Sequence, residues 1–203
     1  MFLSRLSLDP RSARARRDLA DPYDMHRTLA RVFASGDEDA VPRFLWRLEP
    51  TAVWHDPVLL VQSGVAGDWA QLGDRSNYLR RPVETKEIDP RQLLVSGARY
   101  RFRLHANPTV TRSGKRHGLA SEDAQLQWLA RQGENSGFRV ENCLVIGSDM
   151  LILRKGEAQI SLLRACFEGV LSVTNAELAE QALVSGVGPG KAFGCGLLSV
   201  ARG

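Results

Sequence analysis

Arg99-Tyr100-Arg101-Phe102-Arg103-Leu104-His105-Ala106 alternates basic and apolar side chains residue by residue. Successive side chains of a β-strand point to opposite faces of a sheet, so this stretch predicts a strand with one basic and one apolar face. Between Arg91 and His117 there are seven Arg or Lys and no Asp or Glu, and a basic turn follows the strand. Such a surface favours a polyanion as ligand. The candidate binding residues here are Arg99, Arg101, Arg103, Lys115 and Arg116.

This strand opens the second of two similar halves. In the first half we expect strands at Phe2–Leu8, Phe44–Leu48 and Pro57–Gln62, a helix from Asp21 to about Ala34, a short helix near Trp69 and Leu72, and a linker or edge strand at Pro82–Pro90. In the second half we expect a helix after Ser121, extended runs at Phe138–Ile146, Met150–Leu153 and Gln159–Val173, a helix at 175–185 and a final strand.

Each half therefore approximates β-α-β-β-α-β, which is the ferredoxin-like unit. We expect an α+β fold of two tandem ferredoxin-like, RRM-like domains, residues 1–88 and 91–203. The first carries the candidate active-site helix, and the second carries the basic strand and a glycine-rich loop. A cleft between the domains is the expected site.

The composition indicates the general class of protein but not its function. The chain has 203 residues, of which 43% are hydrophobic and 25% charged, as in ordinary globular proteins. Cys143, Cys166 and Cys195 are far apart with no CxxC pair, which argues against a disulfide framework or zinc site and favours a reducing compartment. The sequence shows no signal peptide or membrane-length apolar stretch, so we expect a soluble cytoplasmic protein with no membrane partner.

Five glycines lie within the eleven residues Gly186–Gly196. A helix terminator would explain Gly186 alone, because Thr174–Glu177 resembles a capping box for the preceding helix. The order helix, glycines, strand is the reverse of a dinucleotide-binding fingerprint, and Lys191 is not followed by Ser or Thr as in a Walker A loop. The density instead predicts a loop shaped for close backbone contact. The residues expected to make such contacts, with another backbone or with a phosphate, are Gly188, Gly190, Lys191, Gly194 and Gly196.

The helix that begins after Asp21 carries the candidate chemistry. Asp21 is a natural N-cap and Pro22 fits the first helical position, and the buried stripe should comprise Met25, Leu29, Val32 and Phe33. Helical spacing places His26 at the edge of this stripe, Tyr23 beside it, and Arg27 and Arg31 toward solvent. His suits proton transfer near neutral pH, although a lone His at a helix edge is more often a packing residue. No two histidines have metal-ligand spacing, so we expect no metal.

Three motifs in order resemble a known family. They are Asp21-Pro22-Tyr23-Asp24-Met25-His26-Arg27, Asn107-Pro108 with Gly114-Lys115-Arg116, and Gly186–Gly196. Together they resemble the CRISPR repeat-processing endoribonuclease of type I-E systems, the CasE kind within the RAMP superfamily. The resemblance covers nearly the whole chain. Arg31 stands where lysine would be equally expected, which preserves the charge.

The resemblance implies two tandem ferredoxin-like domains that bind the stem-loop of the CRISPR repeat. It implies cleavage at the 3′ base of the stem and retention of the product beside other Cascade subunits. His26 and Tyr23 would be the active-site pair, and a basic hairpin containing Arg154 and Lys155 would enter the RNA major groove.

RNA supplies its own nucleophile, the 2′-hydroxyl, so cleavage needs a base, an acid and positive charge but no obligatory metal or small-molecule cofactor. We expect a 2′,3′-cyclic phosphate product. His26 would take the proton from the 2′-OH or give one to the leaving 5′ oxygen, Tyr23 would orient or share that role, and Arg27 or Arg31 would support the transition state. The alternatives are a non-catalytic RNA-binding subunit of the same fold and, with less support, a nucleotide-binding metabolic enzyme.

Overall fold

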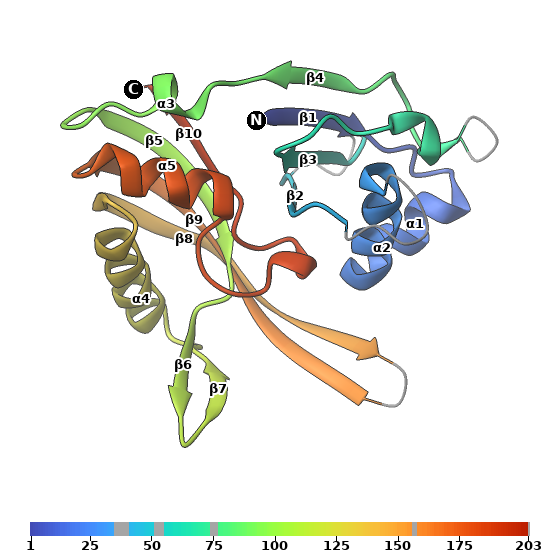
Figure 1. Ribbon diagram of the computed structural model, residues 1–203. Coiled ribbons are helices and arrows are strands. Elements are labelled where there is room, and N and C mark those ends of the chain that lie inside the picture. Colours follow the sequence, from blue (N-terminus) through green and yellow to red (C-terminus); the bar gives the residue numbers. More distant parts are fainter. Residues whose placement is uncertain (35–40, 51–54, 74–76, 156–157, 203) are drawn as a thin grey trace. The chain divides into compact units, whose positions relative to one another are not determined.

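The computed structural model describes residues 1–34, 41–50, 55–73, 77–155 and 158–202, with the side chains of 153–160 outside the description. The chain divides into two compact units (Figure 1). The first comprises Met1–Ile88 and Ala192–Gly194, and the second comprises Asp89–Lys191 and Cys195–Gly203. Within the described residues, no helix has both the length and the apolar character needed to cross a membrane.

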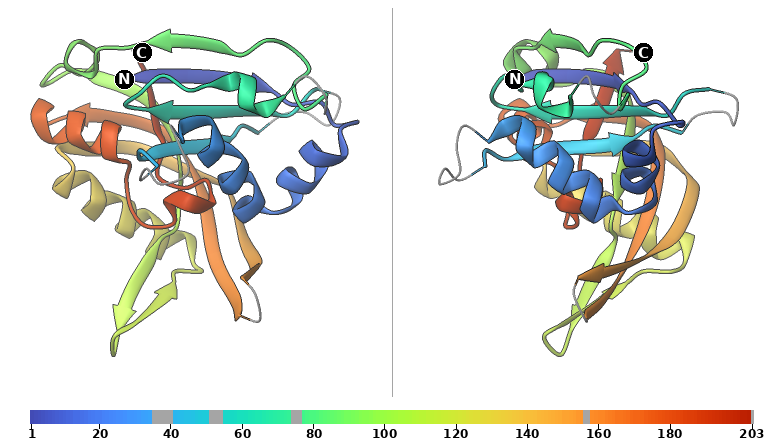
Figure 2. Two further views of the ribbon diagram at one scale, coloured as in Figure 1. Left: turned by 45° about the vertical axis from the view of Figure 1, so that its right-hand side comes forward. Right: turned by 90° about the vertical axis from the view of Figure 1, so that its right-hand side faces the viewer.

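The first unit contains an antiparallel sheet in the order β2-β3-β1-β4. The unit's first and third strands adjoin at the centre, and its second and fourth strands lie at the edges, as in a ferredoxin-like domain. Two helices, α1 and α2, lie on one face of the sheet (Figure 2). The elements are β1 Phe2–Ser7, α1 Ala13–Ala20, α2 Pro22–Phe33, β2 Phe44–Leu48, β3 Val58–Ser63, the 3-10 helix η1 Trp69–Leu72 and β4 Glu84–Glu87.

The core of the first unit lies between α2 and the sheet. Met25 and Leu29 of α2 pack with Leu6 of β1, Trp46 of β2 and Leu59 of β3, and all five are almost completely buried. The predicted apolar stripe of α2 is therefore confirmed. The proline-bounded stretch at 82–90 contains the edge strand β4, whose exposed and mostly charged residues suit the margin of a sheet.

The second unit repeats this arrangement with an antiparallel sheet in the order β10-β5-β9-β8. In both figures α4 and α5 lie on one face of the sheet, and the β6–β7 hairpin projects away from it (Figures 1 and 2). Tandem ferredoxin-like domains are thus the fold of this chain. The elements are α3 Pro90–Leu93, β5 Arg99–Ala106, β6 Thr109–Arg112, β7 Lys115–Gly118, α4 Glu122–Asn135, β8 Phe138–Lys155, β9 Ala158–Val173, α5 Ala176–Ser185, the 3-10 turn η3 Lys191–Phe193 and β10 Leu198–Arg202.

One strand differs from the sequence prediction. The runs predicted separately at Phe138–Ile146 and Met150–Leu153 form the single strand β8, which pairs with β9 along its whole length. Gly147 sits at a register shift and not at a chain break, since the pairing slips by one residue between Val145 and Gly147. A bulge of this kind bends a strand without ending it.

Candidate active site

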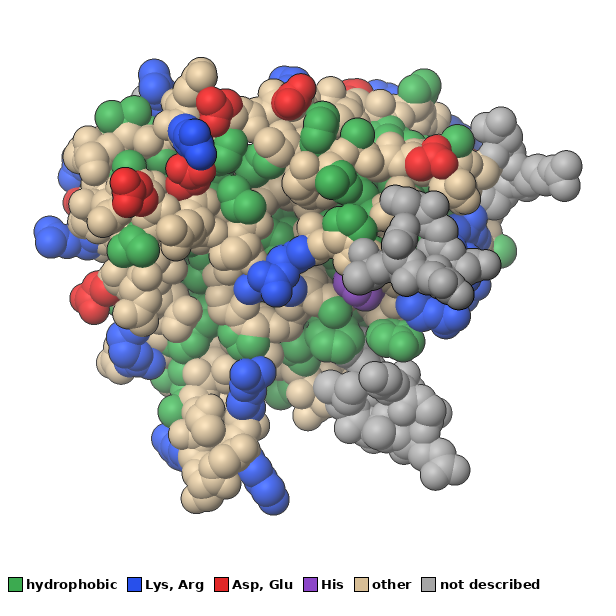
Figure 3. All heavy atoms as spheres, in the orientation of Figure 1, with side chains coloured by type: hydrophobic (Ala, Val, Ile, Leu, Met, Phe, Trp, Pro, Cys, Tyr) green, Lys and Arg blue, Asp and Glu red, His purple; other side chains and the backbone are tan. Residues whose placement is uncertain are grey.

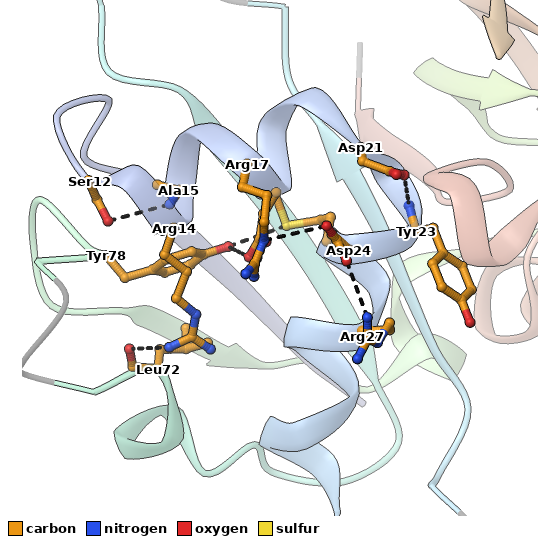
Figure 4. Close-up of polar contacts among 12 residues, drawn as sticks. Ser12, Arg14, Ala15, Arg17, Asp21, Tyr23, Asp24, Arg27, Leu72 and Tyr78 are labelled. Atoms are coloured by element: carbon orange, nitrogen blue, oxygen red, sulfur yellow. Dashed lines mark hydrogen bonds and ion pairs between the residues drawn. The ribbon is translucent and has the colours of Figure 1, made fainter. Parts of the chain in front are cut away.

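The first turn of α2 is built as its sequence predicts. The side chain of Asp21 accepts a hydrogen bond from the backbone N–H of Tyr23 (2.8 Å), and Pro22 occupies the first turn. This cap fixes where the helix begins, and therefore which side chains face the core. Figure 4 shows the Tyr23 side chain directed away from the charged cluster formed by Arg17, Asp24 and Arg27.

His26 is half-buried at the edge of the apolar stripe. Its ring stacks on Phe44 of β2, with 4.8 Å between ring centroids and 20° between planes. The Nδ1 atom is buried and has no hydrogen-bond partner among the described residues. Burial lowers the pKa of His26 below its ordinary value of 6.5, because the charged form of the imidazole is desolvated. The imidazole therefore has a defined packing contact on one ring face, and its lowered pKa favours the neutral form at pH 7.

Arg27 and Arg31 follow Tyr23 around the exposed side of α2. Arg27 forms an ion pair with Asp24 (3.4 Å), and its side chain remains 58% exposed. Within the described residues, no acidic side chain pairs with Arg31. Positive charge thus continues from the edge where His26 and Tyr23 lie toward helix α1.

Helix α1 was missed by the sequence analysis, and it brings two more arginines to this surface. Arg14 and Arg17 of α1 and residues of α2 line a hollow of about 330 Å³. The signal that could have found α1 is Ser12, whose hydroxyl accepts a hydrogen bond from the N–H of Ala15. The lining residues are Arg14, Arg17, Asp24, Arg27, Thr28 and Arg31.

A buried network holds the α1 arginines in place (Figure 4). The Asp18 carboxylate, which is fully buried, accepts hydrogen bonds from Arg17 (2.8 Å) and from the hydroxyl of Tyr78 (3.0 Å). Burial and the neighbouring Asp18 raise the pKa of Tyr78 far above its ordinary value, so its hydroxyl stays protonated and donates. Arg14 lies over the Tyr78 ring, 5.1 Å from its centroid, and donates to the carbonyl of Leu72 (3.2 Å).

The basic strand β5 has the predicted alternation, with Tyr100, Phe102 and Leu104 buried. Two of its three arginines already form ion pairs within the protein, so their charge is partly compensated before any ligand binds. Arg99 pairs with Glu141 (2.9 Å), and Arg103 pairs with Glu168 on the adjacent strand β9. Arg101 is exposed without an ion pair in the described part of the chain. His105, predicted on the basic face, is instead 7% exposed.

The basic turn after β5 forms the β6–β7 hairpin, in which Lys115 and Arg116 are exposed. Ser113 and Gly114 at its tip have φ of 49° and 73°, the left-handed region that tight hairpin turns require. Figure 3 shows Lys and Arg side chains on the lobe that Figure 1 labels β6 and β7. Arg154 and Lys155 end the strand β8, but their side chains lie outside the described residues, and their contact with RNA stays a prediction.

The glycine-rich loop begins where α5 ends, at Gly186, whose N–H bonds to the carbonyl of Ala182. A Cβ on Gly194 would lie 2.9 Å from the indole of Trp46, so this glycine permits a close approach to the core of the first unit. Phe44, two residues before Trp46 on the same strand face, carries the His26 ring. The glycines with positive φ in this loop are Gly186, Gly188, Gly190, Gly194 and Gly196.

Gly188, Gly190 and Gly194 lie against the protein's own side chains. Gly188 lies against Trp128 in the same way as Gly194 lies against Trp46, and Lys191 begins the η3 turn. Binding of RNA phosphates by the loop therefore stays a prediction. Among the described residues, no group of three or more His, Cys, Asp or Glu is placed to hold a metal ion.

The chain thus combines two ferredoxin-like domains with a half-buried histidine and two exposed arginines on one capped helix. The chain belongs to the CRISPR associated protein family, whose model matches residues 1–202. It is 40% identical to the CRISPR-associated endoribonuclease Cse3 of Thermus thermophilus over 99% of this chain and 100% of that one. It is 30% identical to the CRISPR system Cascade subunit CasE of Escherichia coli K12, over 99% of both chains.

Comparison with solved structures finds similarity to the same endoribonucleases. A structure of CRISPR endoribonuclease Cse3 bound to a 19-nucleotide RNA superposes with a TM-score of 0.89 at 40% identity, covering 100% of both chains. Thermus thermophilus Cse3 bound to an RNA representing a pre-cleavage complex superposes with a TM-score of 0.88 at 38% identity, covering 99% of this chain and 98% of that one. The resemblance found in the sequence motifs is thereby confirmed.

Proposed function

We propose that this chain is an endoribonuclease that binds the stem-loop of a CRISPR repeat and cleaves the precursor RNA at the 3′ base of the stem. The relatives that match it along nearly their whole length are named as a CRISPR-associated endoribonuclease and a Cascade subunit. Because the match spans both domains, we extend both properties to this chain, including association with other Cascade subunits after cleavage.

The single observation that carries the catalytic proposal is the setting of His26. Its ring is fixed by Phe44, its Nδ1 is enclosed, and its pKa is lowered by burial. Nε2 is then the nitrogen that meets the substrate. A neutral imidazole near pH 7 accepts a proton readily, so we assign His26 as the general base.

The proposed reaction is a transphosphorylation within the RNA strand. Nε2 of His26 takes the proton of the 2′-OH, the 2′ oxygen bonds to the adjacent phosphorus, and the bond from phosphorus to the 5′ oxygen breaks. The hydroxyl of Tyr23, one helical turn away on the same edge of α2, gives a proton to the leaving 5′ oxygen. The products are a 2′,3′-cyclic phosphate and a 5′-hydroxyl. No external nucleophile enters the reaction.

In this mechanism, guanidinium groups stabilise the negative charge that develops on the oxygens of the pentacoordinate phosphorus. Arg27 and Arg31 are exposed on the same helix, and Asp24 compensates only the first of them within the described part of the chain. A fixed positive charge near the scissile phosphate stabilises the transition state more than the ground state, because negative charge builds up on the equatorial oxygens.

The test is single-turnover cleavage of an end-labelled CRISPR-repeat hairpin in excess EDTA. We expect cleavage at the 3′ base of the stem, and an upstream fragment that carries a cyclic phosphate. His26→Ala should slow this step by about 10²–10⁴-fold, while hairpin affinity stays within a few-fold, since one side chain contributes little to an interface spread over many phosphates. A hairpin that is bound but never cut would support the non-catalytic subunit, and cleavage that needs added Mg²⁺ would contradict the mechanism.

A further inference from the structure

The α1 side of the hollow between α1 and α2 has no role in the proposed reaction. Two of the hollow's arginines, Arg27 and Arg31, come from the catalytic helix, but Arg14 and Arg17 come from α1. Four guanidinium groups line it against one carboxylate, that of Asp24, among the described residues. A concave surface with this surplus of positive charge attracts a phosphate.

The two α1 arginines are both held in place by the protein, but they differ in how far their charge is compensated. Arg14 has no acidic partner in the described part of the chain, and it is oriented by the Tyr78 ring and the Leu72 carbonyl. Arg17 pairs with buried Asp18 (2.8 Å) and with Asp24 (3.4 Å), and its side chain remains 56% exposed. Guanidinium groups that are already fixed lose less side-chain entropy when an anion binds.

The hollow is continuous with the catalytic edge of α2. In Figure 4, Tyr23 and Arg14 lie at opposite ends of the drawn cluster, with Arg27 between them. From Tyr23 to Arg31 the helix rises about 12 Å at 1.5 Å per residue, whereas stacked nucleotides of one strand rise about 3.4 Å each. This stretch of α2 is therefore long enough to face more than one phosphate, the reacting one near Tyr23 and His26 and a further one beside the α1 arginines of the hollow.

We propose that this hollow binds a backbone phosphate of the single-stranded RNA that continues 3′ of the cleavage site. The inference rests on the proposed function, because the strand that is cut at the 3′ base of the stem is the one that passes His26 and Tyr23 and continues in the 3′ direction. The interaction exists in the precursor and ends when the downstream fragment leaves. Arg14 and Arg17 thus favour uncut RNA over the retained product and hold the strand in line for the reaction.

The experiment compares two RNAs that cannot be cut, each with deoxyribose 5′ of the scissile phosphate. One ends at that phosphate, and the other continues for several unpaired nucleotides. The extension should tighten binding to the wild-type protein and steepen its salt dependence. Arg14→Gln should remove part of this gain, because each single-strand phosphate that is no longer neutralised reduces the slope of log K against log salt by about 0.7. Binding of the short RNA should be unaffected.

The matched control is Arg16→Gln. Arg16 lies on the same helix and is exposed, but its side chain donates to the carbonyls of Pro10 and Arg11 and does not line the hollow. The Arg16→Gln variant should bind the extended RNA more tightly than the short one by the same factor as the wild-type protein does. Arg17 is left intact, because its removal would leave the buried Asp18 without its cation.

If Arg14→Gln unfolds the first unit, the same test is made from the RNA side. Neutral methylphosphonate linkages in the extension should remove the gain with wild-type protein. Equal gains for wild type and Arg14→Gln, or a neutral extension that binds as tightly as the charged one, would overturn the proposal and favour an acidic protein segment as the occupant. Cleavage of the all-ribose hairpin by wild type, measured separately, shows whether the proposed function itself holds.

Discussion

Replacing Gly194 with alanine tests whether the glycine-rich loop supports the catalytic helix. Gly194 has φ of +78°, and an added Cβ would lie 2.9 Å from Cζ3 and 3.0 Å from Cη2 of Trp46, closer than real Cβ atoms approach their neighbours. Trp46 is 3% exposed and packed in the core of the first unit, so it cannot move aside freely. We therefore expect two separate penalties, one from backbone conformation and one from overpacking.

Gly97 provides a matched control, because it has the same φ of +78° and nothing within 4 Å of an added Cβ. Gly97→Ala should cost about 1–2 kcal/mol for the left-handed backbone alone. Gly194→Ala should cost that amount and a further 1–3 kcal/mol, roughly, for forcing a methyl group against a packed ring. The difference between the two variants isolates the interaction with Trp46.

The assays are the free energy of unfolding in urea and single-turnover cleavage of the repeat hairpin. Displacement of Trp46 passes along β2 to Phe44, on which His26 stacks, so Gly194→Ala should also slow cleavage while Gly97→Ala leaves the rate unchanged. Equal stability and equal cleavage rates in the two variants would show that a methyl group at Gly194 does not disturb Trp46, and the loop would then serve only to end the preceding helix.

Two further predictions concern charge. Because burial lowers the pKa of His26 below 6.5 and a base must be neutral, single-turnover cleavage should rise with pH through an apparent pKa below 6.5 and level off by pH 7; a rate that falls as pH rises over this range would make His26 the acid. Lys115→Ala with Arg116→Ala should weaken hairpin binding and reduce the slope of log K against log salt by up to about 0.9 for each duplex phosphate that is no longer neutralised. An unchanged salt slope would remove the β6–β7 hairpin from the interface.

The parts of the site that local sequence determines were predictable. Asp21 and Pro22 fix the start of α2, and helical spacing then puts Met25 and Leu29 in the core and His26 at its edge. Strict alternation likewise identifies β5. Each of these features depends on neighbours within a few residues.

Features that depend on distant partners were not predictable. Helix α1 has the Ser12 cap as a local signal but Leu19 as its single large apolar residue, and its buried Asp18 is bonded to Tyr78, 60 residues away in sequence. The carboxylates that pair with Arg99 and Arg103 lie 42 and 65 residues away, so the basic strand seemed less compensated than it is. The arginine hollow was missed for the same reason, since it exists only where α1 and α2 meet.

The central claim is that the RNA's own 2′-hydroxyl, activated by His26, cleaves the strand. The most direct measurement uses a repeat hairpin in which the single ribose 5′ of the scissile phosphate is deoxyribose, in EDTA, beside the all-ribose hairpin. The phosphates that give affinity are unchanged, so both RNAs should bind nearly equally. The all-ribose hairpin should be cut and the modified one should stay intact, whereas cleavage of the modified hairpin at the normal position would show that water is the nucleophile and would contradict attack by the 2′-hydroxyl.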